Sequence, residues 1–394
     1  MMSLKTPAFT ARSSQIIVLI AAIVAGLIGL RYKSWLSEPS RFQDLAVYRR
    51  GAEAILSGDE LYQSRTHGQG ELVFTYPPFA AIAFTVFALL PWVASISLLL
   101  VLSACAYALF VYLFGRELNW PTGQILLAGY FGLLSEPILR TVQQGQINVV
   151  LAALVVVDLL LLPRRFRGVL IGLAAGIKLV PAAFVICLVA QRDWRSIIRV
   201  AVTGLATIAV SYLVNPASTR QYWLKLLFST ERSGGGGYPD NQSLVGVIAR
   251  ILHDDTPNPL ATLPLQAAAL GAAYYVVRRA HERNDRATLV VAGAMGSLLA
   301  SPVSWSHHWI WCIPFIMQLC ASRQYIFSLI AAAVFAVSPL TLSPLGVLDQ
   351  VPRPWWVLAT AAMPLTGAAW LIMQGFGARP IRVGSVNTIH APGR

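Results

Sequence analysis

About a dozen runs of mostly apolar residues follow one another along this chain, and short polar loops separate them. A helix needs about 20 mostly apolar residues to cross the roughly 30 Å of hydrocarbon in a bilayer. Only 12% of the 394 residues are charged, well below the share in soluble domains. We therefore predict an all-α polytopic membrane protein that forms one integral membrane domain over residues 1–394. The expected crossings lie near residues 15–30, 78–92, 95–114, 122–139, 146–162, 168–190, 197–214, 263–277, 287–301, 308–320, 325–342 and 355–375.

Basic residues gather in the loops between these runs. Loops rich in Lys and Arg stay in the cytoplasm, so the net charge of +13 indicates membrane topology, and we expect no nucleic-acid partner. With a cytoplasmic N-terminus, the count of crossings places residues 31–77 and 215–262 outside and returns the C-terminus to the cytoplasm. We expect a multi-pass protein of the plasma membrane or cell inner membrane, surrounded by membrane lipids, with its chemistry on the extracytoplasmic face.

One basic loop, residues 163–168, conflicts with the simple count, which places it outside. The alternative is that segments 122–139 and 168–190 are re-entrant pairs of half-helices, the second broken near Lys178 and Pro181. Broken backbone is tolerated at membrane depth where it lines a cavity. The chain then has about ten full crossings instead of about twelve, and the basic loops on both sides of 168–190 are cytoplasmic.

The first outer loop contains an amphipathic segment that begins at Asp44 and ends before Gly58. Apolar positions recur there at helical spacing, which predicts a short helix lying in the membrane interface. Asp44 is either the N-cap of this helix or a general base that takes a proton from an acceptor hydroxyl, and the two roles are compatible. Gly58 is expected to end the helix. Arg49 is a candidate donor of charge-assisted hydrogen bonds to a lipid phosphate.

Several other polar residues lie in or beside apolar runs, where an unpaired charge or amide is costly. Lys178 either extends toward the membrane surface or binds a phosphate. His307 and His308 belong either to an interfacial aromatic belt or to a binding site, and two adjacent histidines without a third ligand predict no metal site. Gln146 and Asn148 either cap a helix or bind sugar hydroxyls. Asp158 is predicted to be a structural or an interfacial carboxylate.

A glycine-rich stretch at residues 233–237 precedes Asn241 and Gln242. Four glycines are costly to order, so we predict a mobile loop that covers a bound sugar. Asn241 and Gln242 then become candidates for contacts with that sugar.

In this order, the motifs make the chain similar to the polyprenol-phosphate-mannose-dependent mannosyltransferases of glycosyltransferase family 87. The resemblance runs nearly end to end and is carried by residues 44–48, 56–62, 74–78, 145–148, 172–181, 241–244 and 301–309. It implies the type C glycosyltransferase fold, with about 10 to 12 transmembrane helices. Ser306 departs from the family pattern, which often has an acidic residue before the histidine pair.

The resemblance also implies an inverting transfer of a hexose, with mannose expected, from a polyprenyl-phosphate donor to a lipid-linked or cell-envelope glycan. Asp44 is the implied general base, and neither metal nor cofactor is expected. The implied substrate-binding residues are His307, His308, Lys178, Arg49, Tyr48, Tyr76, Gln146, Asn148, Asn241 and Gln242. The alternatives are a transporter or flippase of lipid-linked sugars and, third, a membrane scaffold. A flippase tolerates an amide at Asp44, whereas the enzyme does not.

Overall fold

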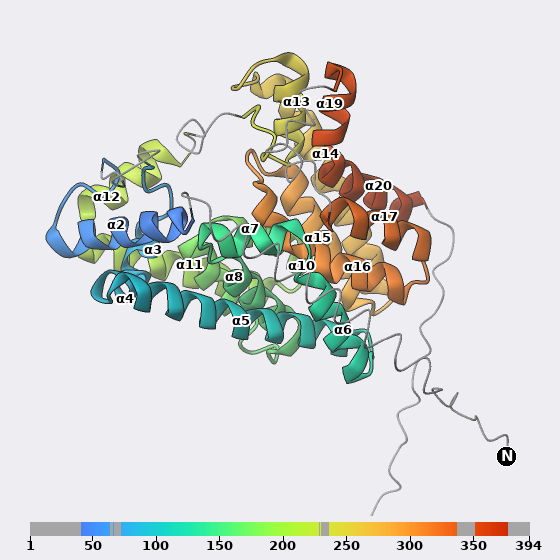
Figure 1. The fold of residues 1–394 in the computed structure, drawn as a ribbon. Helices are drawn as coiled ribbons and strands as arrows, with labels where there is room; N and C mark the ends of the chain where they lie inside the picture. Colours follow the sequence, from blue (N-terminus) through green and yellow to red (C-terminus); the bar gives the residue numbers. More distant parts are fainter. Residues whose placement is uncertain are drawn as a thin grey trace, which may run out of the picture.

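The structure is a computed structural model, and it describes residues 41–63, 66, 72–227, 229, 236–336 and 351–376. This part of the chain is helical (Figure 1). The predicted crossing at 15–30 and the glycines at 234 and 235 lie outside the described residues. The main helices are α2 (Gln43–Ser57), α3 (Pro78–Ala83), α4 (Thr85–Leu89), α5 (Trp92–Glu117), α6 (Thr122–Gly132), α7 (Glu136–Gln144), α8 (Asn148–Val156), α9 (Val169–Ile177), α10 (Val185–Ala190), α11 (Trp194–Val214), α12 (Pro216–Gln221), α13 (Leu244–Leu252), α14 (Pro259–Glu282), α15 (Arg286–Ala300), α16 (Cys312–Ala321), α17 (Tyr325–Ala336), α19 (Arg353–Thr360) and α20 (Ala362–Phe376).

Within the described residues, three helices, α5, α11 and α14, are each long and apolar enough to cross a membrane. Two bent pairs, α6 with α7 and α19 with α20, each turn by 64° and bring the number to five if each pair is one span. The other apolar helices are shorter, and several are continued by 3₁₀ or π turns. The protein is therefore a multi-pass membrane protein with many broken helices.

The helix α5 extends from one face of the protein to the other. Its 26 residues make about 39 Å of helix at 1.5 Å per residue, enough to cross a bilayer. Just before its first residue, Arg49 of α2 donates a hydrogen bond to the carbonyl oxygen of Leu90. At its other end, Glu117 forms an ion pair with Arg286 at 3.2 Å. We call the face of the protein at the first end of α5 the α2 face, and the face at its other end the basic face.

The expected crossing at 78–92 is wrong. The chain there forms α3 and α4, of six and five residues, which break at Phe84. From 78 to 89 they are about 18 Å long, too short to span the hydrocarbon. Both remain on the α2 face, since Arg49 also donates to the carbonyl oxygen of Phe87 and α3 packs against α2.

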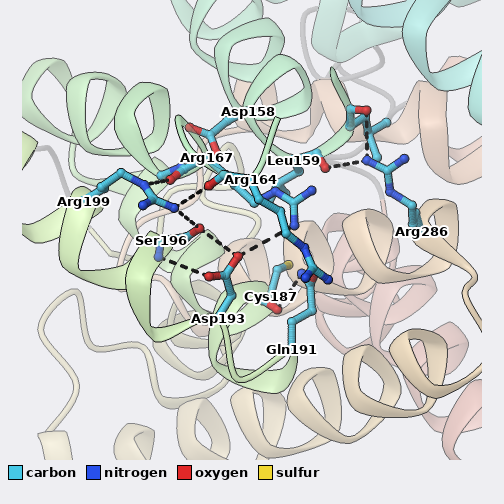
Figure 2. Close-up of polar contacts among 12 residues, drawn as sticks. Asp158, Leu159, Arg164, Arg167, Cys187, Gln191, Asp193, Ser196, Arg199 and Arg286 are labelled. Atoms are coloured by element: carbon cyan, nitrogen blue, oxygen red, sulfur yellow. Dashed lines mark hydrogen bonds and ion pairs between the residues drawn. The ribbon is translucent and has the colours of Figure 1, made fainter. Parts of the chain in front are cut away.

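The basic loop 163–168 lies on the same face as loop 191–199. Arg199 donates from Nε to the carbonyl oxygen of Arg167 at 2.7 Å and from its guanidinium to that of Arg164 (Figure 2). The intervening segment α9, η2 (Val180–Phe184) and α10 thus enters the protein and returns to the same face, which confirms the re-entrant alternative for 168–190. Lys178 marks the break with extended backbone at φ −148°.

The other proposed re-entrant pair, 122–139, instead crosses the protein. The helix α6 begins beside the end of α5 on the basic face, since Trp120 N in the intervening turn donates to Gly115 O of α5, and Gln124 N of α6 donates to Pro121 O in the turn. The bent partner α7 ends at the α2 face, where Phe42 N donates to Gln143 O at 2.6 Å. The re-entrant prediction for 122–139 is therefore wrong, because the pair connects opposite faces.

Asp158 holds the start of the re-entrant segment. Its carboxylate is fully buried and accepts hydrogen bonds from the backbone N–H groups of Gly168, Leu170 and Ile171. Unsatisfied N–H groups at a helix start are costly inside a membrane protein, so a carboxylate there stabilises α9. The structural role predicted for Asp158 is confirmed.

The helix α15 lies at the centre of the larger apolar core and is buried on almost every side. Gly293 and Gly296 allow neighbours to approach, since a Cβ at Gly296 would lie 2.4 Å from Ala273 Cβ of α14. A second apolar cluster surrounds α2 and includes Tyr48, Phe74 and Phe84. The functional residues described below lie where this second cluster meets the chain that follows α15.

This arrangement predicts which exposed positions react in intact cells. Thr256→Cys, in the loop before α14, should react with a membrane-impermeant maleimide added outside, because 215–262 belongs to the α2 face. Asn284→Cys, on the basic face, should react only after the membrane is permeabilised. Wild-type protein gives the background from its own cysteines. Labelling of Asn284→Cys but not Thr256→Cys in intact cells would show the opposite orientation in the membrane and contradict this prediction.

Candidate functional site

A cavity of about 920 Å³ opens at the α2 face. Segments far apart in the sequence line it: the start of α2, the stretch 72–77, the break after α9, the π-helical turn η3 (Tyr222–Leu226) and the chain after α15. Among the residues singled out from the sequence, the lining contains Asp44, Tyr76, Gln146, Lys178, His307 and His308.

Asp44 lies in the first turn of α2, two residues after the N-cap position. The helix begins at Gln43, its N-cap is Phe42, and no side chain caps it, so the N-cap interpretation of Asp44 is wrong. The carboxylate instead accepts a hydrogen bond from Gln146 Nε2 at 2.7 Å. The first helical turn stabilises its negative charge. Gly58 ends the helix with φ 78°, as predicted.

Gln146 is the centre of the polar network at this site. Its Oε1 accepts from Tyr48 Oη at 2.8 Å and from Lys178 Nζ at 3.4 Å, while its Nε2 also reaches Tyr76 Oη at 3.3 Å. Gly145 precedes it with φ 70° and ends α7 against α2. Ile147 is the N-cap of α8 without a side-chain bond, so the capping interpretation of Gln146 is wrong.

Lys178 is half-buried at the break of the re-entrant segment and lines the cavity. Its Nζ donates to Asn148 Oδ1 at 2.9 Å and lies 5.4 Å from the centre of the Tyr76 ring. Within the described residues no carboxylate forms an ion pair with it. Its charge is therefore balanced by neutral oxygens and a ring, which leaves it suited to bind an anion. A lysine extending to the membrane surface is not what the structure shows.

His307 and His308 occupy the 3₁₀ turn η5 (Ser306–Trp311), with ring centres 4.8 Å apart. The turn is tied to α8, since the carbonyl oxygen of His307 accepts from Asn148 Nδ2 at 3.0 Å. Both Nε2 atoms are buried and without a hydrogen-bond partner in the described part of the chain. Both rings line the cavity, so they do not belong to an interfacial belt, and each offers a polar atom to a ligand.

Ser306 takes part in the same anchoring. Its hydroxyl donates to Glu136 Oε1 at 2.9 Å, and Glu136 begins α7. The serine that replaces the acidic residue of the family pattern thus contacts a buried carboxylate from another helix.

Asn241 and Gln242 support the cavity wall but do not line it. Asn241 pairs with Trp305 in an isolated β-bridge, and its Oδ1 accepts from the backbone N–H of Ser304. Gln242 N donates to Ser304 O at 2.7 Å. Both amides are buried, 0% and 2% exposed. Asn241 thus holds segment 301–305, while the side chain of Gln242 donates to the carbonyl oxygens of Pro239 and Thr360; their direct contact with a sugar stays a prediction.

Arg49 also lies outside the cavity lining. Its guanidinium donates to the carbonyl oxygens of Phe87 and Leu90 and to Ser95 Oγ, and it stacks over Trp92. These acceptors belong to the turn between α4 and α5. Arg49 therefore has a structural role in this turn, and its contact with a lipid phosphate stays a prediction.

Burial raises the pKa of the Asp44 carboxyl group. The hydrogen bond from Gln146 and the positive charges of Lys178 and Arg140 oppose this shift. Burial also raises the pKa of the Tyr76 hydroxyl, and the nearby Asp44 charge adds to that effect. Asp44 is therefore a half-buried base of raised proton affinity, while Tyr76 stays protonated at neutral pH.

Some residues that line the cavity were not predicted from the sequence, because no sequence pattern distinguished them. Tyr222 and Leu226 come from η3, in a segment expected only to be an outer loop, and Tyr222 stacks on Tyr62 with ring centres 5.7 Å apart. The described residues contain no group of three His, Cys, Asp or Glu side chains arranged to hold a metal.

Comparison with known proteins gives consistent matches. Residues 74–302 match glycosyltransferase family 87. The polyprenol-phosphate-mannose-dependent alpha-(1-2)-phosphatidylinositol pentamannoside mannosyltransferase of Mycolicibacterium smegmatis is 33% identical over 351 residues, which cover 85% of each chain. The polyprenol-phosphate-mannose-dependent alpha-(1-2)-phosphatidylinositol mannoside mannosyltransferase of Mycobacterium tuberculosis is 30% identical, covering 85% of this chain and 84% of the other.

Among solved structures, ArnT from Cupriavidus metallidurans bound to undecaprenyl phosphate aligns with a TM-score of 0.33 and 15% identity. The alignment covers 90% of this chain and 77% of that one.

Proposed function

Because the chain belongs to glycosyltransferase family 87 and is therefore a membrane glycosyltransferase, we propose that it transfers mannose from a polyprenyl-phosphate donor to a lipid-linked or cell-envelope glycan. One observation carries the proposal: Gln146 joins Asp44 and Lys178 inside a single cavity. The same cavity therefore offers a half-buried carboxylate and a half-buried cation, the two groups that we assign to transfer from a glycosyl phosphate.

Asp44 acts as the general base. An acceptor hydroxyl attacks the anomeric carbon of the donor from the side opposite the phosphate. As the new C–O bond forms, the hydroxyl proton moves to the Asp44 carboxylate and the bond to phosphate breaks. The polyprenyl phosphate leaves with the bonding electron pair, the configuration at the anomeric carbon is inverted, and the proton on Asp44 later passes to water.

Lys178 binds the donor phosphate and stabilises the charge that grows on it as the bond breaks. His307 and His308 offer their unpartnered Nε2 atoms to the phosphate or the sugar. Two neighbouring side chains act by positioning these groups. Tyr48 orients Gln146, and Asn148 orients Lys178. Tyr76 forms part of the sugar site beside both charged groups.

The site is proposed to face the extracytoplasmic side. The cavity lies at the α2 face, opposite the loops 163–168, 191–199 and 278–286, which carry most of the described basic residues between helices. Because such loops remain in the cytoplasm, the donor is expected to be used on the outer leaflet of the plasma or inner membrane. The chain is proposed to act as one integral membrane domain.

A donor panel with purified protein tests this function. Polyprenyl-phosphate mannose should support transfer to a mannosylated glycolipid acceptor, whereas a nucleotide-linked mannose and polyprenyl-phosphate glucose should not. The anomeric configuration of the product, read by NMR, should be opposite to that of the donor. Movement of intact donor across liposomes without any product would favour a flippase, and retained configuration would exclude Asp44 as the base of a single displacement.

The hydrogen bond from Gln146 predicts a pH effect. Transfer needs ionised Asp44, so kcat/KM falls as the pH drops through the pKa of this group. Gln146→Leu removes a bond that lowers this pKa, so the pKa should rise and the acidic limb of the pH profile should move to higher pH. Gln318→Leu, which removes a buried amide far from the cavity, is the control and should leave the limb in place. A limb that moves to lower pH in Gln146→Leu would contradict the assignment.

A further inference from the structure

Residues 158–199 contain six arginines, all within 163–168 and 191–199, and two aspartates, Asp158 and Asp193. The hydrogen bonds of Arg199 to loop 163–168 bring its end of α11 against that loop (Figure 2). The two loops form one surface, named the arginine surface. Its residues are Arg164, Arg165, Phe166, Arg167, Arg192, Trp194, Arg195 and Arg199.

Within the described residues, the positive charge of the arginine surface is balanced only in part. The carboxylate of Asp158 accepts hydrogen bonds from backbone N–H groups at the start of α9. The carboxylate of Asp193 caps α11 and lies 3.8 Å from the guanidinium of Arg167. Arg164, Arg165 and Arg195 are exposed and form no ion pair within the described residues. Like charges gathered in this way repel one another and attract anions.

The surroundings of Arg167 disfavour its charged form. Burial, together with the positive charge of Arg286, lowers the pKa of its guanidinium. Its Nε is buried without a hydrogen-bond partner. An anion beside the loop would offset both effects.

An exposed apolar stripe leads along α11 to the arginine surface. Trp194, Ile198, Val202 and Leu205 are each 60–63% exposed and follow one another at spacings of four, four and three residues, which places them on one side of the helix. Phe166, also exposed, lies beneath the guanidinium of Arg165, 5.0 Å from its ring centre. A large aromatic residue at the end of such a stripe is typical of the level of lipid headgroups.

From these features we propose that the arginine surface binds the headgroup of an anionic phospholipid, whose acyl chains lie along the exposed stripe of α11. The phosphate contacts the exposed guanidinium groups, because Arg forms charge-assisted hydrogen bonds to phosphate. The apolar stripe favours a lipid over a free phosphate, since a soluble anion has no apolar part that could pack against the stripe. The site lies on the basic face, opposite the cavity that contains Asp44.

Lipid binding to purified protein tests the proposal. Delipidated protein is titrated with phosphatidylglycerol or phosphatidylcholine of the same acyl chains in mixed micelles, and bound lipids are counted by native mass spectrometry. Wild type should retain phosphatidylglycerol in preference to phosphatidylcholine and should melt at a higher temperature with it. The double variant Arg165→Gln/Arg195→Gln should bind phosphatidylglycerol on the order of tenfold more weakly, because each arginine near an anionic headgroup adds to the attraction.

A matched control separates this site from a general effect of charge. Arg116→Gln/Arg323→Gln removes the same charge from exposed positions near the basic face but outside the arginine surface, and it should bind phosphatidylglycerol like wild type. Equal weakening in both double variants would overturn the proposal, as would equal retention of the two lipids by wild type. Equal stabilisation by inorganic phosphate and phosphatidylglycerol would show a free-anion site and would also overturn it.

Discussion

Asp44→Asn should lower the rate of sugar transfer by about 10²–10⁴-fold, the usual contribution of a general base. Asparagine has the size of aspartate and can still accept the hydrogen bond from Gln146, but it does not take a proton from the acceptor hydroxyl. The helix α2 does not depend on Asp44 for a cap, so the variant should fold and purify at normal yield. The measurement is the initial rate of transfer from polyprenyl-phosphate mannose, with yield and melting temperature recorded beside it.

The control for Asp44→Asn is Asp59→Asn. Asp59 follows the end of the same helix, is exposed and accepts only from Ser57, so its loss should leave the rate unchanged. Transfer by Asp44→Asn within about threefold of wild type, well short of a base's contribution, would exclude the catalytic role. Loss of activity together with loss of folded protein would be resolved by Asp44→Glu, which keeps the carboxylate and should retain part of the rate.

Lys178→Met should lower kcat/KM by about 10²–10³-fold, the cost of removing a positioned group that stabilises charge in a transition state. Methionine fills a similar volume but offers no charge to the donor phosphate. Lys178→Arg should recover part of the loss, since it keeps the charge with a different geometry. Steady-state kinetics with varied donor concentration provide the measurement.

The comparison for Lys178→Met is Lys225→Met. Lys225 belongs to η3, next to the cavity, and its side chain is exposed, so its removal should change kcat/KM little. If both variants lost activity equally, the effect would reflect the overall positive charge near the cavity. A normal kcat/KM in Lys178→Met would contradict its assignment to the donor phosphate.

Much of the fold follows from local sequence. The apolar runs at 95–114, 197–214 and 263–277 became α5, α11 and α14, because a long apolar segment in a bilayer must satisfy its own backbone as a helix. The break at Lys178 was also predictable, since a lysine followed by Pro181 interrupts an otherwise apolar run. Gly58 ended α2 as expected because it adopts positive φ without strain.

The site could be predicted only in part. Asp44, Lys178 and the two histidines were found because charged or polar side chains beside apolar runs are costly unless used. Arg49, Asn241 and Gln242 had the same appearance in the sequence, yet their polar groups are satisfied by backbone atoms of distant segments. Hydrogen-bond partners of that kind are set by tertiary contacts and leave no local pattern.

The sequence by itself determined that the chain is a helical membrane protein, where most helices lie and which polar side chains are candidates for the site, since these depend on residue type and short-range spacing. Only the tertiary structure decided that 78–92 stays on one face and that 168–190 enters and returns. The reason is physical: both outcomes rest on hydrogen bonds across the chain, such as Arg49 to Leu90 and Arg199 to Arg167. The same holds for Gln146, which became the centre of the site because α7 ends against α2 and brings its amide within 2.7 Å of Asp44.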